Sequence, residues 1–238
     1  MEREIYELVH ASELSWWYKG RRFVILRALS RFAPAEFITN TRTLDIGAGG
    51  GGMYPFFRAM GRVSALEPDA ESRKLLAEKG YEDIMANDEE LLKRPGIFSL
   101  VGAFDVIEHI SDEKKFLEHV RASLAPNGIL ALTVPAFQFL WSTHDVRAHH
   151  FRRYTKKKIV FLLREAGFDV QYASYWNCAL FFPAAVIRLL GFAGWRSLSL
   201  SSPLDKTILA VIKAESFLLP RISLPFGTGI VVVARKKF

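Results

Sequence analysis

The sequence predicts an α/β fold in which a doubly wound, mainly parallel sheet carries helices on both faces. Short apolar segments typical of strands alternate with segments of helical periodicity from residue 42 to residue 175. A glycine-rich turn follows the first of these strands, and the loop signals LAPNG and EAGF separate helices from the strands that follow them. A chain of 238 residues is long enough to bury the core of such a domain.

We expect four parts along the chain. They are an N-terminal helical cap, an α/β core, a helical insertion and a closing strand of the core sheet, at residues 1–40, 41–176, 177–224 and 225–238. In the cap, apolar residues recur at helical spacing before Pro34. In the core, we predict strands at 42–46, 63–67, 83–86, 98–106, 128–134 and 169–175, and helices at 53–60, 69–79, 112–124 and 155–166.

Composition restricts the classes of function. The formal net charge of +7 predicts attraction to an anionic partner, such as nucleic acid, an acidic membrane surface or a phosphorylated or carboxylated substrate. The single cysteine, Cys178, excludes an internal disulfide framework, a cysteine-ligated zinc site and a three-cysteine iron–sulfur cluster. A reducing compartment fits this, and the N-terminus lacks the apolar segment of a signal peptide, so we expect a cytoplasmic protein.

The turn TLDIGAGGGG, residues 43–52, is the strongest functional signal. Glycines let the backbone turn sharply and approach a ligand, and the helix after them offers free N–H groups at the positive end of its dipole. Such a turn is typical of a site for a nucleotide-like cofactor. Asp45 stands two residues before Gly47, where a carboxylate favours an ammonium or hydroxyl group and repels a pyrophosphate. We therefore expect S-adenosylmethionine rather than NAD.

An acidic residue at the end of the second predicted strand supports adenosine binding. Glu67 follows Gly47 by 20 residues, a spacing at which a carboxylate accepts hydrogen bonds from two ribose hydroxyls. The same spacing serves NAD, so Glu67 alone does not select the cofactor.

With these motifs in order, the chain resembles the class I S-adenosylmethionine-dependent methyltransferases of the broad small-molecule group. The resemblance covers roughly residues 40 to 176 and the closing strand, and includes DxGxGxG, FDVIEHI and LAPNGILALTVP. It implies a Rossmann-like sheet of seven strands whose last strand is antiparallel, and it places Asp88 near the adenine amino group. The implied cofactor site consists of Asp45, Gly47, Gly49, Gly51, Glu67, Asp88, Phe104 and Asp105.

Departures from related patterns argue against a nucleic acid substrate. The fourth strand lacks the NPPY or DPPY signature of enzymes that methylate exocyclic amines of nucleobases. Cys178 follows an asparagine, whereas cytosine C5 enzymes carry a Pro-Cys pair. We expect a small-molecule or lipid-linked acceptor and no nucleic acid partner.

The segment after the fifth predicted strand is the expected substrate site. It reads AFQFLWSTHDVRAHHFRRYTKKK, at the carboxyl end of a strand, and resembles an HD…HxRRYT pattern found in a subset of these methyltransferases. Histidine has a pKa of about 6.5 and accepts a proton near neutrality. We predict His150 as the general base, His144 as the second choice, and Asp145 as the residue that orients a histidine.

Other residues of this segment are predicted to bind the acceptor. Arg152 and Arg153 suit bidentate contact with a carboxylate or phosphate, although salt bridges or the start of the basic helix that follows would equally explain them. The histidines equally have the alternative of packing or of facing solvent. The predicted acceptor-binding residues are Trp141, His149, Arg152, Arg153 and Tyr154.

Glu108 and His109 raise the question of a metal. Some related O-methyltransferases carry ExxEH at this place and bind a divalent cation with a further histidine, whereas this chain has Asp105 for the first glutamate. Oxygen and nitrogen ligands of this kind suit magnesium or a similar ion. The EH pair is also common in relatives that use no metal, and we predict no metal site.

Two apolar stretches precede the closing strand. Arg188 interrupts the first, and lysine and glutamate residues interrupt the second, so neither provides the roughly 20 mostly apolar residues that span a bilayer. We favour a lid over the substrate pocket or a contact in a homodimer. The alternative is a peripheral contact with the inner face of the membrane, in which Arg188, Arg196 and the basic segment from Arg235 to Lys237 meet anionic lipid.

These features predict an enzyme that moves the methyl group of S-adenosylmethionine onto an oxygen of a hydrophobic small molecule or lipid-linked acceptor. Nitrogen or carbon acceptors rank below oxygen. Two other functions stay open: a non-catalytic or membrane-associated S-adenosylmethionine-binding scaffold or sensor, and an NAD-dependent oxidoreductase. The oxidoreductase is weakened by Asp45 and by the lack of a recognisable TyrxxxLys constellation.

Overall fold

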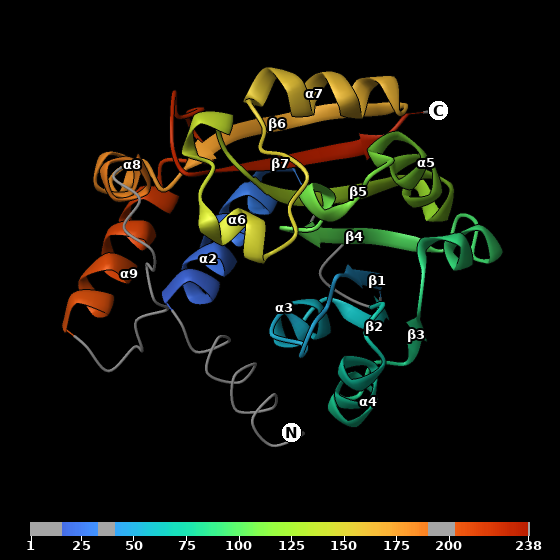
Figure 1. Cartoon of the computed structure of the whole chain (residues 1–238). Coiled ribbons are helices and arrows are strands. Elements are labelled where there is room, and N and C mark those ends of the chain that lie inside the picture. Colours follow the sequence, from blue (N-terminus) through green and yellow to red (C-terminus); the bar gives the residue numbers. More distant parts are fainter. Residues whose placement is uncertain (1–15, 33–40, 190–202, 238) are drawn as a thin grey trace.

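A seven-stranded sheet forms the centre of the molecule (Figure 1). The computed structural model describes residues 16–32, 41–189 and 203–237. The strands are β1 (Thr41–Ile46), β2 (Gly61–Leu66), β3 (Asp83–Met85), β4 (Phe98–Phe104), β5 (Leu124–Pro135), β6 (Phe168–Trp176) and β7 (Gly229–Lys236).

The strand order confirms the predicted fold class. It is β3-β2-β1-β4-β5-β7-β6, and β7 runs antiparallel to both of its neighbours while the other pairs are parallel. The direction of winding reverses between β1 and β4, and a sheet of this kind binds ligands at the carboxyl ends of the strands at such a switch point. The segments after β1, β2, β4 and β5 therefore converge on one edge of the sheet.

Helices connect the strands and cover the sheet. Besides the predicted helices, four short ones that the periodicity did not reveal follow β3, β4 and β5. The helices are α2 (Trp16–Phe32), α3 (Tyr54–Arg58), α4 (Ala70–Lys79), η2 (Asp88–Lys93), η3 (Ile107–His109), α5 (Glu113–Ser123), η4 (Gln138–Leu140), α6 (Thr143–Arg147), α7 (Lys156–Glu165), α8 (Phe181–Leu189) and α9 (Pro203–Ser216).

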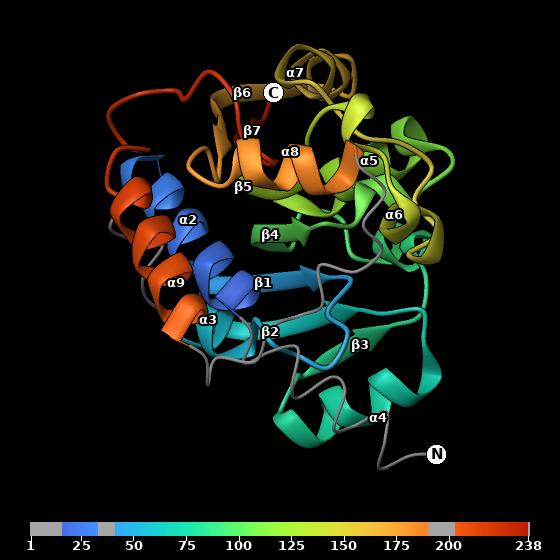
Figure 2. The ribbon, with the colours of Figure 1, turned by 60° about the vertical axis from the view of Figure 1, so that its left-hand side comes forward.

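The helix before the core and the second helix of the insertion lie side by side, α2 against α9 (Figures 1 and 2). Gly20 permits this approach, because a Cβ there would stand 3.0 Å from side-chain atoms of Ile212. On the sheet side of α2, the Trp17 ring packs 4.7 Å from that of Trp176 at the end of β6. The parts of the predicted cap and insertion at residues 1–15, 33–40 and 190–202 lie outside the described residues.

The central strands of the sheet are buried on both faces and form the hydrophobic core. The run Ile230 to Ala234 in β7 is fully apolar and almost completely buried, as expected for a strand covered on both sides. In β4, Gly102 leaves room for the ring of Phe57 on α3, since a Cβ would come within 2.5 Å of it. The helices are thereby held close to the strands whose ends form the site.

Two predicted boundaries were wrong. The strand predicted at 98–106 ends at Phe104, because Asp105 takes a left-handed conformation with φ of 58°. The predicted loop LAPNG lies inside β5, where the pairing with β4 shifts register between Phe98 and Leu100 and Asn127 has φ of 61°. The turn residues thus produce an irregular strand start and not a separate loop.

Among the described helices, none combines the length and the apolar composition required to cross a bilayer.

Candidate active site

The glycine turn after β1 has the backbone conformation that the sequence predicts. Gly47, Gly49 and Gly51 have φ of 67°, 53° and 84°, values that residues with a Cβ rarely adopt. At Gly47 a side chain is also excluded by space, because a Cβ would lie 2.6 Å from Val106 Cγ2. The turn therefore brings backbone to the switch point in a conformation that glycine adopts readily.

Glu67 holds this turn. Its Oε2 accepts a hydrogen bond from the backbone N–H of Gly49 at 2.7 Å, and its Oε1 accepts one from Asp69 N at 3.0 Å. The residue is 8% exposed. A carboxylate has about four acceptor positions, so these two bonds leave capacity for the ribose hydroxyls that the prediction assigns to Glu67.

Asp45 is buried at the end of β1 and accepts a hydrogen bond from the Tyr81 hydroxyl at 2.8 Å. Burial raises the pKa of Asp45 from 3.8 to about 7, against the opposing effects of the Tyr81 hydrogen bond and the Arg21 charge. Near neutral pH the carboxylate is therefore ready to ionise when a cationic group approaches.

Asp45→Asn is expected to stabilise the ligand-free protein while weakening its affinity for S-adenosylmethionine. Between pH values of about 4 and about 7 the folded protein holds a proton on Asp45 that the unfolded chain releases. The free energy of unfolding of the unchanged protein therefore falls as pH rises through this window. The amide avoids that cost. We expect a gain in the free energy of unfolding at pH 8 of at most about 4 kcal/mol, and a smaller gain at pH 5.

Urea unfolding at the two pH values measures this difference, and calorimetry measures the affinity. Asp169→Asn is the matched control, since Asp169 is exposed on β6 and its change should be silent at both pH values. Equal stability of Asp45→Asn and the unchanged protein at pH 8 would contradict the expectation.

The end of β4 contains an ion pair that sequence reasoning missed. Asp105 Oδ2 accepts a hydrogen bond from Arg21 Nη1 at 2.7 Å, and its Oδ1 accepts one from Thr133 Oγ1 at 3.0 Å. Arg21 comes from α2, is 5% exposed and also donates to the carbonyl of Phe104. The predicted cap helix thus contributes a buried cation to the switch point. No local pattern in the sequence predicts this contact between Arg21 and Asp105.

Asp88 stands at the first position of η2, after β3. Its Oδ2 lies 2.7 Å from Nδ1 of His119 on α5, and its side chain is 34% exposed. The predicted contact with the adenine amino group stays a prediction, and His119 is the residue that fixes the orientation of Asp88.

Asp145 is the centre of the segment after β5. It is fully buried, and its Oδ1 lies 2.9 Å from His150 Nδ1. Arg153 binds it in bidentate fashion, through Nε at 2.8 Å and Nη2 at 3.0 Å. Asp145 also completes a capping box at the start of α6 with Ser142. The structure thereby brings the predicted base and its predicted orienting residue together.

The two arginines of the HxRRYT segment already have carboxylate partners. Arg153 is 5% exposed and bound to Asp145, while Arg152 forms an ion pair with Glu113 of α5. The Tyr154 hydroxyl donates to the same Glu113 at 2.8 Å, and burial, followed by this contact, raises the pKa of Tyr154. The sequence predicts such salt bridges as the alternative to acceptor binding by the two arginines. The contacts of both arginines with an anionic acceptor stay a prediction.

Glu108 and His109 face the predicted base. One ligand atom from each of Glu108, His109 and His150 lies within 4.8 Å of the other two. Glu108 is fully buried, and within the described part of the chain neither carboxylate oxygen has a hydrogen-bond partner. Burial, and then the charge of Asp105, raise the pKa of Glu108 well above its usual value.

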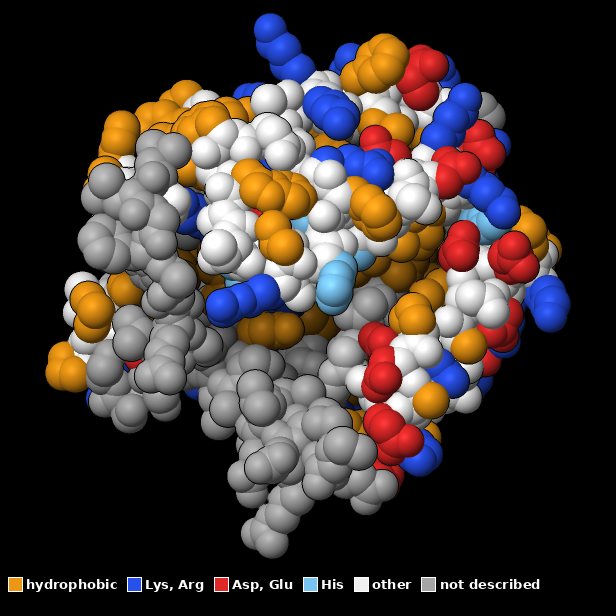
Figure 3. Space-filling view, viewed as in Figure 1, with side chains coloured by type: hydrophobic (Ala, Val, Ile, Leu, Met, Phe, Trp, Pro, Cys, Tyr) orange, Lys and Arg blue, Asp and Glu red, His pale blue; other side chains and the backbone are white. Residues whose placement is uncertain are grey.

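The remaining predicted residues of the segment after β5 differ in exposure. The His144 ring lies 6.1 Å from that of His150 and, like His149, belongs to an exposed residue, whereas Trp141 is half-buried. Asp105, Phe137 and His149 have φ of 58°, 56° and 55°, a costly conformation that recurs at functional sites. All three follow β4 or β5, at the carboxyl edge of the sheet. On the face in Figure 3, a histidine borders a hollow with hydrophobic walls.

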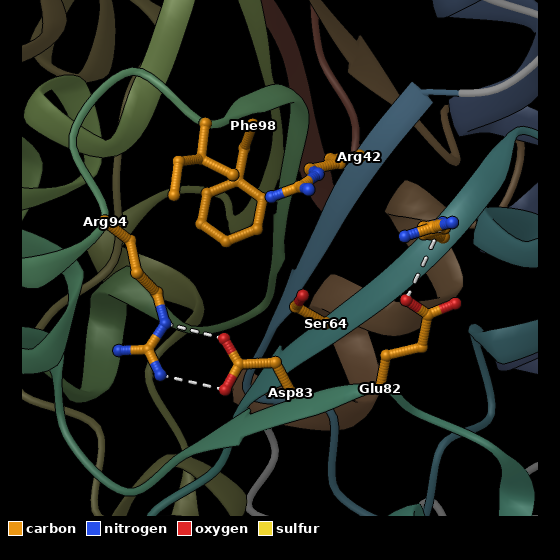
Figure 4. Close-up of a pocket in the computed structure, with 8 residues that line it drawn as sticks. Arg42, Ser64, Glu82, Asp83, Arg94 and Phe98 are labelled. Atoms are coloured by element: carbon orange, nitrogen blue, oxygen red, sulfur yellow. Dashed lines mark hydrogen bonds and ion pairs between the residues drawn. The ribbon is translucent and has the colours of Figure 1, made fainter.

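A cavity of about 230 Å³ lies elsewhere, at the amino ends of β1, β2, β3 and β4 (Figure 4). Arg94 binds Asp83 there through Nε at 2.6 Å and Nη2 at 2.8 Å. Because this is the edge opposite the glycine turn, the cavity does not belong to the cofactor site.

Comparison with known proteins identifies the family. The methyltransferase-domain family matches residues 16–173. Ubiquinone biosynthesis O-methyltransferases from Bradyrhizobium sp. and Nitrobacter winogradskyi are 35% and 33% identical over 103 residues, which is 40% of this chain. The match spans only 40% and 38% of the length of those relatives.

Solved structures confirm the fold. A SAM-dependent methyltransferase from Archaeoglobus fulgidus aligns with a TM-score of 0.58 and 19% identity, over 90% of this chain and 94% of that one. A phosphoethanolamine N-methyltransferase from Haemonchus contortus in complex with S-adenosyl-L-methionine aligns with a TM-score of 0.56 and 17% identity, over 90% of this chain and 52% of that one. The chain therefore belongs to the methyltransferase-domain family.

Proposed function

We propose that this chain is an S-adenosylmethionine-dependent methyltransferase that acts on a hydroxyl group of a hydrophobic small molecule or lipid-linked acceptor, with His150 as the general base. The observation that carries the proposal is the pair of Asp145 and His150, with Nδ1 of the ring 2.9 Å from the buried carboxylate. A carboxylate at Nδ1 favours the tautomer that carries its proton there. The lone pair of Nε2 is then free to accept the proton of an acceptor hydroxyl.

The reaction requires the protein to align the acceptor oxygen with the methyl carbon and the sulfur, and to accept one proton. The acceptor oxygen attacks the methyl carbon, the bond from carbon to sulfur breaks, and S-adenosylhomocysteine leaves with the electron pair. The hydroxyl proton passes to His150. Holding acceptor, carbon and sulfur in line provides most of the acceleration, and a positioned base adds a further factor of about 10² to 10⁴.

Aromatic side chains next to this cluster support a hydrophobic acceptor. Phe137 stacks on Tyr175 with ring centroids 4.9 Å apart, and Phe181 of α8 lies 5.7 Å from Phe137 and 6.3 Å from Phe139. Phe139 is 55% exposed. The relatives named as ubiquinone biosynthesis O-methyltransferases agree with oxygen as the methylated atom and with an apolar acceptor.

His150→Gln is expected to lower kcat by at least about 100-fold without changing the affinity for S-adenosylhomocysteine, because only the proton acceptor is lost. Phenols and catechols with apolar tails of different length serve as acceptors, with methyl-labelled S-adenosylmethionine and mass spectrometry of the methyl ether. His144→Gln is measured in parallel, since His144 is the alternative base. A larger loss of kcat in His144→Gln would reverse the assignment, and methylation of amines alone would exclude the hydroxyl acceptor.

The same cluster fits a divalent cation, against the prediction of no metal. Glu108, His109 and His150 would supply one carboxylate and two imidazoles, and a cation would pair with the buried Glu108. A bound cation would lower the pKa of the acceptor hydroxyl. Assay of the chelated enzyme with and without added Zn²⁺, Mn²⁺ or Mg²⁺ tests the two roles of His150. Activity that survives chelation supports the base, and strict dependence on one ion, with loss of that ion's binding in His150→Gln, supports the ligand.

A further inference from the structure

The residues just before helix α8 are hydrogen-bonded to another helix of the insertion. The carboxylate of Glu215 on α9 accepts hydrogen bonds from the backbone N–H groups of Cys178 at 2.7 Å and Ala179 at 3.2 Å, and also from that of Asn177. These three N–H groups lie just before α8. The carboxylate therefore fixes the start of the helix.

The other end of α8 is tied to the segment that carries the proposed base. Arg188 Nη1 donates to the carbonyl of Leu140 at 3.1 Å, and it lies 3.4 Å from Ser142 Oγ and 3.4 Å from Asp145 Oδ2. Between the two ends, Ala184 and Ala185 are buried. Figure 2 shows α8 running alongside this part of the chain.

The contact at Arg188 is looser than its neighbour at Arg153. Arg153 approaches Asp145 with two nitrogens at 2.8 Å and 3.0 Å, and its side chain is 2% exposed. Arg188 approaches with one nitrogen at 3.4 Å, and its side chain is 27% exposed. Long, partly solvated ion pairs of this kind are weak, so the Arg188 contact can open while Arg153 keeps Asp145 in place.

We infer that Arg188 is a positioning residue that fastens α8 as a lid over the acceptor side of the site, through the carboxylate that holds His150. Phe181 at the start of the lid then stands above Phe137 and Phe139, and the acceptor enters when Arg188 leaves Asp145. The position of Arg188 argues against its meeting anionic lipid in this state. The acceptor side rests on the proposed function, but the fastening of α8 to Asp145 does not.

Hydrogen exchange of the full chain with S-adenosylhomocysteine bound tests the lid. We expect Arg188→Gln to speed exchange of the backbone amides of residues 184–189 at least about tenfold, while those of β4 and β5 stay unchanged, because only the local opening becomes easier. Arg221→Gln is the matched control, since Arg221 lies in the same insertion and, among the described residues, its side chain donates to the Phe217 carbonyl and not to the segment after β5. Unchanged exchange in α8 would overturn the inference.

A conservative variant separates positioning by charge from simple filling of space. Arg188→Lys keeps a cation that can reach Asp145, so we expect slower exchange of residues 184–189 in Arg188→Lys than in Arg188→Gln. Equal exchange rates in the two variants would overturn the inference. Neither measurement involves methyl transfer, so each can fail while the proposed base survives.

Discussion

Glu67→Ala is expected to weaken the binding of S-adenosylhomocysteine by at least about 100-fold. Its carboxylate orients the glycine turn through Gly49 N, and the family resemblance assigns it to the ribose hydroxyls as well. Hydrogen bonds to a charged group contribute about 1.5 to 3 kcal/mol each, and about 1.4 kcal/mol corresponds to a factor of ten in affinity. Isothermal calorimetry measures the dissociation constant directly.

Two variants make this test specific. Glu67→Gln keeps one carbonyl oxygen that can accept from Gly49 N, so we expect an intermediate loss. Glu71→Gln is the matched control, because Glu71 is half-exposed on α4 and its ion pair within the described residues is with Lys74, away from the glycine turn. A dissociation constant for Glu67→Ala within about threefold of the unchanged protein would show that the turn is not held by this carboxylate.

Asp145→Ala is expected to lower the free energy of unfolding by about 3 to 5 kcal/mol, the usual cost of leaving a buried charge without its partner. The uncompensated group is Arg153, which is 5% exposed. Burial alone would raise the pKa of Asp145, but hydrogen bonds from His150 and Arg153 outweigh it and hold this pKa below the usual range. The stabilisation is therefore present above the pKa of the unfolded carboxyl and is lost as pH falls toward the folded value.

Urea unfolding at pH 7 measures the loss. Asp112→Ala is the comparison, since Asp112 caps α5 from an exposed position and its removal should cost about 1 kcal/mol. Adding Arg153→Met to Asp145→Ala removes the orphaned cation and should recover part of the stability. If Asp145→Ala costs no more than Asp112→Ala, the cluster does not stabilise the segment after β5.

The cofactor side of the site was predictable because its signals are local. The sequence predicts a tight turn at Gly47, Gly49 and Gly51 because glycine tolerates positive φ, and all three have positive φ in the structure. Glu67 was placed by its distance along the chain from the turn, and it contacts that turn. The spacing of strands and helices determines both positions, so the sequence alone carries the information.

The partners of the charged residues were not predictable in the same way. Arg21 meets Asp105 across 84 positions, and Arg152 meets Glu113 across 39. Such pairs depend on which helix packs against the end of which strand. The periodicity of the sequence does not predict this packing. For both arginines after His150 the sequence therefore leaves acceptor binding and salt bridges equally open, and the structure gives each an acidic partner within the protein.

The position of β7 has a consequence for biosynthesis. β7 lies between β5 and β6, and β6 pairs with no other described strand. Until residues 229–236 have been synthesised and have left the ribosome, one edge of β5 and one edge of β6 lack the hydrogen bonds that β7 provides. The glycine turn and Glu67 are translated before that point. The half of the sheet that carries the proposed proton acceptor is thus the last to complete its pairing, and until then the open edge of β5 is a place where a strand of another chain can pair.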